Sequence, residues 1–143
     1  MELRPYLRKA QFYETDGMGI VYHGNYVHWM EEARCDFMEQ IGYGYHQVVD
    51  KGFDIALTDI ACHYQSMTRF GDTVRIFVRI TGLSPAKLKL SYRMEDAGSG
   101  QVRFTGESRH FFYDRSRGRP TALKRILPEL YRQFEALAEQ EPL

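Results

Sequence analysis

The chain has 143 residues, of which 43% are hydrophobic, so it is long enough for one domain with its own core and too short for two. Nineteen basic and nineteen acidic residues cancel, which argues against a broad surface for nucleic acid. No apolar run approaches the roughly 18 residues that a membrane-spanning helix needs, and the polar N-terminus lacks a secretion signal. These properties predict one cytoplasmic domain over residues 1–143, without nucleic-acid partners and without a membrane span.

The first two predicted elements are a strand and a long helix. Residues 6–14 mix apolar and polar side chains and stop at an Asp-Gly turn, which favours a strand. Apolar residues then recur at helical spacing, at Tyr26, Met30, Ala33, Phe37 and Ile41. Asn25 is the predicted N-cap of this buried helix, Gly42 its predicted stop, and Glu31 and Arg34 are expected to pair on its exposed side.

Four strand-like segments follow a glycine-containing loop, at residues 54–64, 73–83, 86–96 and 101–114. The second and third of these alternate most regularly, with apolar residues at Val74, Ile76, Val78 and Ile80 and then at Leu88, Leu90, Tyr92 and Met94. A last helix is predicted from Pro128. The element order predicts an α+β domain in which an antiparallel sheet curls around one apolar helix, followed by a C-terminal helix.

The cysteines and most histidines suggest no catalytic or metal site. Cys35 and Cys62 are far apart and lack metal-ligand spacing, so we expect buried, reduced thiols. His23 and His28 are five residues apart, which is wrong for two ligands on one helix face. The remaining histidines, His28, His46, His63 and His110, have no acidic partner nearby in sequence and are expected to be packing or surface residues. No metal and no cofactor is expected.

Asp16 is the most informative polar residue because it precedes the start of the long helix. A helix N-terminus carries unpaired backbone N–H groups and a partial positive charge, so it can polarise a carbonyl group. A carboxylate beside it can then act as an acid or a base on the polarised group. An ordinary Asp-Gly turn, in which Asp16 makes only local hydrogen bonds, explains the same residues.

The segment TDGMGIVYHGNY at residues 15–26, followed by EEAR at 31–34, resembles the signature of the 4-hydroxybenzoyl-CoA thioesterase family of hotdog-fold acyl-CoA thioesterases. This family includes the small bacterial thioesterases associated with the Tol-Pal system. RFGD at residues 69–72 and GRP at 118–120 extend the resemblance over nearly the whole chain. One departure is Met67-Thr68, where the family commonly has Pro-Ala, so the resemblance does not imply an acyl-chain specificity.

The resemblance implies a hotdog fold, hydrolysis of an acyl-CoA to a carboxylic acid and CoA, and a homodimer or homotetramer with active sites between chains. The family's catalytic carboxylate falls on Asp16, as a base or a nucleophile, and its carbonyl-polarising backbone N–H falls on His23. Further expected substrate contacts are Tyr22, Gly24 and Tyr26 at the helix start, and Arg69, Lys87 and Lys89 for the CoA phosphates. A plain core stripe explains the tyrosines, and a solvated strand face explains the lysines, without any ligand.

Two alternative functions stay open at this point. In a hotdog hydratase or dehydratase, which also acts on acyl thioesters, the His23 side chain would be the main acid or base. In a non-catalytic acyl-CoA-binding domain, the thioester would be bound and left intact. Release of a free thiol distinguishes hydrolysis from both.

Overall fold

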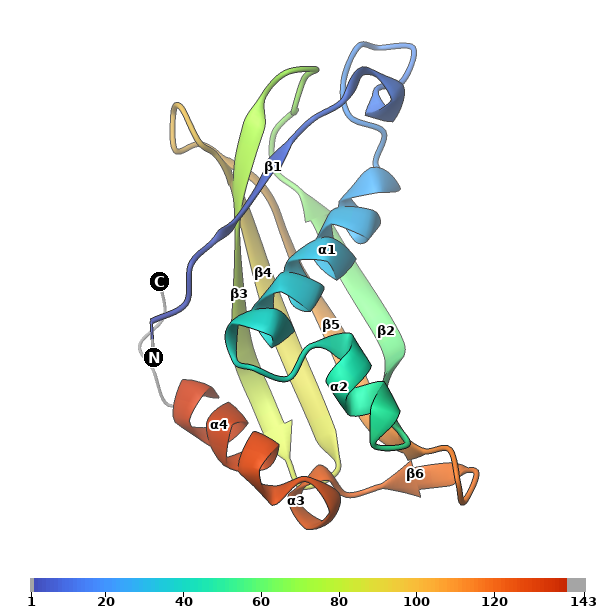
Figure 1. Ribbon diagram of the computed structural model, residues 1–143. Helices are drawn as coiled ribbons and strands as arrows, with labels where there is room; N and C mark the ends of the chain where they lie inside the picture. Colours follow the sequence, from blue (N-terminus) through green and yellow to red (C-terminus); the bar gives the residue numbers. More distant parts are fainter. Residues whose placement is uncertain (1, 139–143) are drawn as a thin grey trace.

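A curved antiparallel sheet holds one long helix on its concave face in the computed structural model, which describes residues 2–138 (Figure 1). The strands lie in the order β1 (Tyr6–Lys9), β3 (Thr73–Ser84), β4 (Lys87–Asp96), β5 (Val102–Asp114) and β2 (Phe53–Tyr64), and β6 (Arg119–Thr121) pairs with β5. The helices are α1 (Asn25–Gln40), α2 (Tyr45–Asp50), α3 (Leu123–Ile126) and α4 (Pro128–Ala138), and η1 (Phe12–Glu14) is a 3-10 turn. The predicted α+β class and the hotdog arrangement are confirmed.

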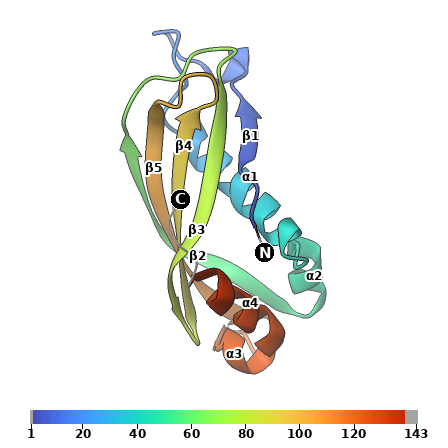
Figure 2. The ribbon, with the colours of Figure 1, turned by 90° about the vertical axis from the view of Figure 1, so that its left-hand side faces the viewer.

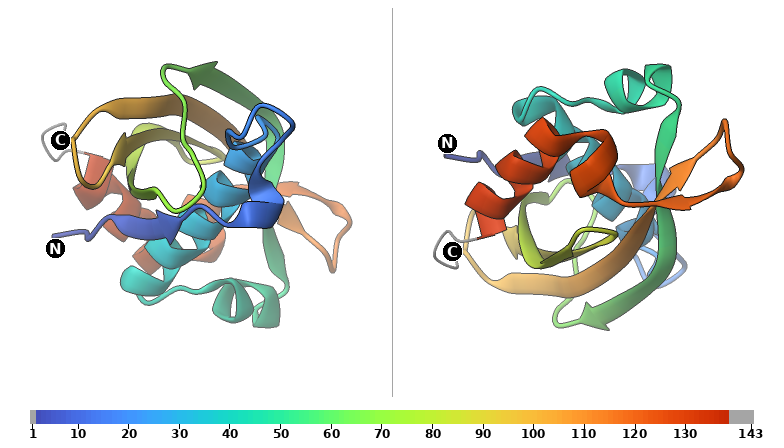
Figure 3. Two further views of the ribbon diagram at one scale, coloured as in Figure 1. Left: turned by 90° about the horizontal axis from the view of Figure 1, so that it is seen from above. Right: turned by 90° about the horizontal axis from the view of Figure 1, so that it is seen from below.

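The core lies between α1 and the concave face of the sheet. Every second residue is buried there from Val74 to Ile80 in β3 and from Leu88 to Met94 in β4, because successive side chains of a strand point to opposite faces. The predicted inward sets of both strands and the helix stripe Tyr26, Met30, Ala33, Phe37 and Ile41 are all buried. Figure 2 shows that the other face of the sheet carries no helix, and the end views in Figure 3 show the sheet curving around α1.

The start of the chain differs from its prediction. The strand ends at Lys9, and Phe12–Glu14 turn back as η1 instead of continuing it. The buried Glu14 carboxylate stabilises this turn by accepting a hydrogen bond of 2.9 Å from the Gln11 N–H. The sheet therefore has a short edge strand at β1 and a long one at β2.

Two predictions about the ends and surface of α1 are wrong. Gly24 occupies the N-cap position instead of Asn25, whose side chain donates to the Glu14 carbonyl at 2.8 Å. Arg34 donates to the Tyr92 hydroxyl at 3.0 Å instead of reaching outward to Glu31. Gly42 does follow the helix, with a positive φ of 85° that suits glycine at such an end.

Short elements and the thiols account for the other differences. The short elements α2, α3 and β6 were not predicted, because three to six residues carry too little periodicity. Cys35 and Cys62 are free, but Cys35 is exposed on α1 and Cys62 is half-buried, so their expected burial is wrong for Cys35. Among residues 2–138, no helix combines the length and the apolar character that crossing a membrane requires.

Candidate active site

A pocket of about 420 Å³ opens where the loop before α1 meets the end of β2. This volume lies within the range of roughly 300 to 1,000 Å³ that small-molecule sites occupy. The lining residues come from three segments, and they are Asp16, Met18, Ile20, Val21, His23, Tyr26, Tyr64, Gln65, Ser66, Met67 and Thr68. We call it the Asp16 pocket. It brings together a carboxylate, a helix N-terminus and an aromatic wall.

The loop that carries Asp16 is closed by its own hydrogen bonds. The Asp16 N–H donates to the Ile20 carbonyl at 2.8 Å, and the Gly19 N–H donates to the Asp16 carbonyl at 3.0 Å. One carboxylate oxygen, Oδ1, accepts the Met18 N–H at 2.8 Å. The other oxygen, Oδ2, accepts no hydrogen bond from residues 2–138. The local turn interaction is therefore present, and it leaves one oxygen of a half-exposed carboxylate free for a ligand.

Unpaired backbone donors lie at the start of α1, beside the same pocket. The N–H groups of His23 and Gly24 donate to no acceptor within the described chain, as is usual for the first N–H groups of a helix. An added Cβ at position 24 would lie 2.7 Å from the Tyr22 ring, so a larger residue there would displace that ring. The Tyr22 ring packs over this turn and beside the His23 ring, at 4.2 Å between centroids. The free donors therefore lie in a fixed turn.

Aromatic rings form the inner wall of the pocket. The Tyr26 ring is buried and stacks on Phe104 at 5.0 Å, and Tyr64 meets both rings edge-on at 5.5 Å. The Tyr64 hydroxyl donates to the His23 carbonyl at 3.1 Å, which ties the end of β2 to the start of α1. Tyr26 is therefore both a core residue and a lining residue. Tyr64 was missed by the sequence analysis because nothing local links it to the helix.

Met67 and Thr68, where the sequence departs from the Pro-Ala of the family, also lie in this wall. The buried Thr68 side chain accepts a hydrogen bond of 3.0 Å from the Tyr26 hydroxyl, and its carbonyl accepts the Val21 N–H at 2.8 Å. Burial raises the pKa of the Tyr26 hydroxyl above its usual value, so this group stays protonated and neutral. Met67 lines the pocket and is half exposed. The two replaced residues therefore shape the pocket.

The basic residues expected to contact CoA fall into two groups. Arg69 is exposed beside the Asp16 pocket, where it forms an isolated β-bridge with Ile20. Lys87 and Lys89 lie at the opposite end of the sheet, at the start of β4 (Figure 1). Lys89 is on the outer face, 3.5 Å from the Glu107 carboxylate. The fold thus brings Arg69 to the pocket and leaves both lysines away from it.

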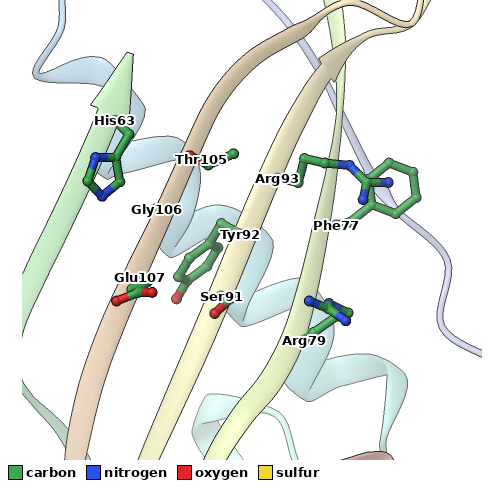
Figure 4. Close-up of a pocket in the computed structure, with 9 residues that line it drawn as sticks. All are labelled: His63, Phe77, Arg79, Ser91, Tyr92, Arg93, Thr105, Gly106 and Glu107. Carbon is green, nitrogen blue, oxygen red and sulfur yellow. The ribbon is translucent and has the colours of Figure 1, made fainter. Parts of the chain in front are cut away.

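The outer face of the sheet has its own hollow of about 240 Å³. Figure 4 shows the side chains of Arg79, Ser91 and Glu107 from three adjacent strands, with α1 behind the sheet. The sheet separates this hollow from α1, and the unpaired N–H groups of His23 and Gly24 lie just before that helix. Among residues 2–138, no group of three or more His, Cys, Asp or Glu side chains is arranged to hold a metal.

A second cavity on the concave side lies between α1, α2 and β4, with a volume of about 130 Å³. Its lining is mostly apolar and comprises Glu31, Arg34, Cys35, Met38, Tyr45, Val48, Ile55, Leu88 and Leu90. We call it the α1–α2 cavity. A chain of hydrogen bonds leads from Arg34 into the sheet. Arg34 donates to the Tyr92 hydroxyl, which lies 2.6 Å from the Ser108 hydroxyl, and the Ser108 hydroxyl lies 2.7 Å from His110 Nε2. Burial and the nearby Arg34 charge lower the pKa of His110 to about 4.

Comparisons with known proteins agree on one family. The protein-family model described as "Thioesterase-like superfamily" matches residues 10–134. A proposed esterase of Aquifex aeolicus is 36% identical over 87 residues, which cover 61% of this chain and 68% of the relative. YneP of Bacillus subtilis, named as a proposed acyl-CoA thioesterase, is 27% identical over 127 residues, 89% of this chain and 91% of the relative. The structure of a DHNA-CoA thioesterase from Staphylococcus aureus superposes with a TM-score of 0.88 at 24% identity, covering 98% and 95% of the two chains.

Proposed function

Because the chain belongs to the thioesterase-like superfamily, we propose that it hydrolyses an acyl-CoA thioester to a carboxylic acid and free CoA, with Asp16 as base or nucleophile. The observation that carries this proposal is the Asp16 pocket, which is lined by Asp16, with one carboxylate oxygen free of hydrogen bonds, and by His23, whose N–H and that of the adjacent Gly24 are unpaired within the described chain. A thioester carbonyl is electrophilic already, so one base and one polarising dipole suffice for its hydrolysis.

In this mechanism the thioester carbonyl oxygen accepts hydrogen bonds from the N–H groups of His23 and Gly24. If Asp16 acts as a base, its Oδ2 takes a proton from water while the water oxygen bonds to the carbonyl carbon. The tetrahedral oxyanion then collapses, the carbon–sulfur bond breaks, and the CoA thiolate takes up the proton. If Asp16 attacks the carbonyl carbon itself, the carbon–sulfur bond breaks, CoA leaves as the thiolate and a mixed anhydride remains; water then cleaves it to the free acid and the Asp16 carboxylate, and the thiolate takes up the proton that this water gives up. Both routes use the same donors for the oxyanion.

A second copy of the chain completes the site in our proposal. β2 has twelve residues on a free edge of the sheet, and Leu57 and Tyr64 on this strand are about half exposed. Such an edge presents unpaired backbone groups that a second strand can satisfy. When two β2 strands pair in antiparallel orientation, the Tyr64 end of one lies beside the Phe53 end of the other. The Asp16 pocket of one subunit then faces the α1–α2 cavity of its partner, which is lined by Ile55.

This arrangement assigns the acyl group to the partner's α1–α2 cavity and the reacting carbonyl to the Asp16 pocket. The mostly apolar lining suits an acyl group, and the small volume suits a ring or a short chain. The assembly is a homodimer, or a homotetramer if two pairs associate further. Arg69 flanks the pocket entrance and is our candidate for the CoA phosphates.

Asp16→Asn tests the catalytic assignment. The amide keeps the size of the side chain and its acceptor for the Met18 N–H, but it removes the base or nucleophile, so we expect thiol release from acyl-CoA to fall about a hundredfold or more. Asp50→Asn, at an exposed position in α2, is the matched control. Turnover of Asp16→Asn within about threefold of wild type would make Asp16 a turn residue only. If the wild-type protein binds acyl-CoA and releases no thiol, a non-catalytic acyl-CoA-binding domain is favoured. If it hydrates an enoyl-CoA, the hydratase alternative is favoured.

Mixing two inactive variants tests the shared site. Cys35→Trp fills the α1–α2 cavity from an exposed position, and Asp16→Asn removes the carboxylate. If each site takes Asp16 from one chain and the cavity from the other, refolding the two variants together restores about one wild-type site in four. Mixed samples that stay inactive, although size measurements show that they exchange subunits, would put both parts of the site in one chain.

A further inference from the structure

A buried carboxylate lies two residues before Asp16. Glu14 is only 3% exposed, although glutamate is seldom buried unless its charge is compensated. It ends η1, in the turn that replaces the second half of the predicted first strand. A buried charge costs free energy, so its neighbours must hold it by strong contacts.

Four hydrogen bonds compensate the Glu14 carboxylate. Arg8 binds both oxygens, with Nη1 at 2.9 Å from Oε1 and Nη2 at 2.8 Å from Oε2. The Gln11 N–H donates to Oε1 at 2.9 Å, and the Trp29 indole N–H donates to Oε2 at 2.8 Å. Burial alone would raise the pKa of this carboxyl, but the hydrogen bonds and the Arg8 charge outweigh burial and lower the pKa below its usual value. Glu14 is therefore ionised and held from β1, η1 and α1 together.

The backbone of the same residue joins the two sides of the active-site loop. The Glu14 carbonyl accepts the Tyr22 N–H and the Asn25 side-chain N–H, each at 2.8 Å. One residue further along, Thr15 pairs with Val21 in an isolated β-bridge. The loop with Asp16 thus leaves from Glu14 and returns to the same carbonyl at the start of α1. Any shift of Glu14 moves Asp16 relative to the N–H groups of His23 and Gly24.

We propose that Glu14 and Arg8 are positioning residues, which hold the Asp16 carboxylate at its working distance from the helix N-terminus. This inference rests on the catalytic role proposed for Asp16. A displacement of about 1 Å between a catalytic group and its substrate costs about a hundredfold in rate, so a rigid support has a large effect on kcat. Arg8 also lies over the Trp29 ring, 5.3 Å from its centroid, which fixes the guanidinium plane.

Glu32 provides an internal control for simple stability. Its Oε1 accepts Arg8 Nε at 2.8 Å and the Tyr6 hydroxyl at 2.8 Å. Glu32 therefore binds the same guanidinium as Glu14, but within residues 2–138 its side-chain hydrogen bonds go to β1 alone and none reaches the loop that carries Asp16. Loss of either carboxylate weakens the cluster, whereas only loss of Glu14 frees the loop.

The experiment compares Glu14→Gln with Glu32→Gln in thermal unfolding, in thiol release from acyl-CoA, and in amide hydrogen exchange of residues 16–22. We expect both variants to lose thermal stability. Glu14→Gln should lower kcat at least tenfold with KM within about threefold, and it should speed exchange of the loop amides. Glu32→Gln should leave kcat within about threefold and the loop amides protected.

Two outcomes would overturn the inference. One is a folded Glu14→Gln protein with wild-type kcat and wild-type loop exchange. The other is an equal loss of kcat in both variants, which would make the cluster a stabilising element only. If Glu14→Gln does not fold, Trp29→Phe removes one of the four hydrogen bonds, keeps an aromatic ring and should show a smaller change of the same kind. Loop exchange reports on positioning even if Asp16→Asn shows that Asp16 is not catalytic, so the two failures are distinguishable.

Discussion

Acid should destabilise this protein through His110, which is buried and uncharged. Arg34 can only donate, so the Tyr92 hydroxyl accepts from it. The arrangement that also pairs both buried hydroxyl protons has Tyr92 donating to Ser108 and Ser108 donating to His110 Nε2. In this arrangement neutral His110 carries its proton on Nδ1, which makes no hydrogen bond to residues 2–138. A second proton on Nε2 would face the hydroxyl that now donates to it. The direction of the chain thus opposes protonation of the ring.

The size of the effect follows from the pKa of His110 in the two states. Burial and the Arg34 charge lower it to about 4, while the Ala56 carbonyl and Asp59 act weakly in the opposite direction. The unfolded chain has an ordinary histidine pKa of about 6.5. Between these two values the unfolded state binds one more proton, so stability is complete above about pH 6.5 and is lost as the pH falls toward 4. This difference between the pKa of His110 in the folded and unfolded states corresponds to about 3 kcal/mol of folding stability.

Urea unfolding of wild type and His110→Gln at pH 7 and pH 4.5 measures this contribution at one fixed protein concentration. Glutamine offers Ser108 an acceptor and does not titrate in this range, so other titrating groups cancel in the difference between the two proteins. We expect wild type to lose about 2 kcal/mol more than His110→Gln between the two pH values. Equal losses in both proteins would refute the argument, because His110 would then have the same pKa folded and unfolded.

Three further predictions concern packing and the site. Gly106→Ala should cost about 1–3 kcal/mol in urea unfolding, because an added methyl would lie 2.8 Å from a buried aromatic ring and 2.9 Å from a β2 carbonyl; a wild-type midpoint would contradict this. Arg69→Ala should raise KM for acyl-CoA in a salt-sensitive way and leave KM for an N-acetylcysteamine thioester, which has no phosphates, unchanged. The double variant with alanine at Lys87 and Lys89 should leave KM for acyl-CoA unchanged; the reverse pattern would assign the CoA phosphates to the lysines. His23→Ala should keep kcat within about fivefold, because its role is assigned to the backbone; a loss as large as that of Asp16→Asn would favour the hydratase.

The sheet and the central helix were predictable because the repeat of apolar residues in each can be read from neighbouring positions in the sequence. Alternation in β3 and β4 and the stripe of α1 depend on residues only two to four positions apart, and both match the buried faces. The cap of α1 was not predictable in the same way. Asn25 is a good capping residue by type, but its side chain is used by the Glu14 carbonyl, eleven residues earlier in the chain.

The candidate site was predictable only where it is contiguous in sequence. Asp16, His23 and Gly24 lie within nine positions, so a motif can identify them together. The inner wall also contains Tyr64 and Thr68, which are about 40 residues from Tyr26 in sequence and contact it only in the folded chain. The burial of Glu14 was not predicted, because it depends on Arg8 and Trp29 from two other elements. Contacts of this kind appear only in the folded chain.

The unequal edges of the sheet also determine how an assembly of this chain can grow. β1 offers four residues and ends in Arg8 and Lys9, whereas β2 offers twelve. If two copies join along β2 as proposed, each chain is a monofunctional unit in the sense of polymer chemistry: both long edges are then used, only the short and charged β1 edges remain, and extension of the sheet stops. A variant with a longer, uncharged β1 would become bifunctional, and its expected product is a fibre instead of a closed pair.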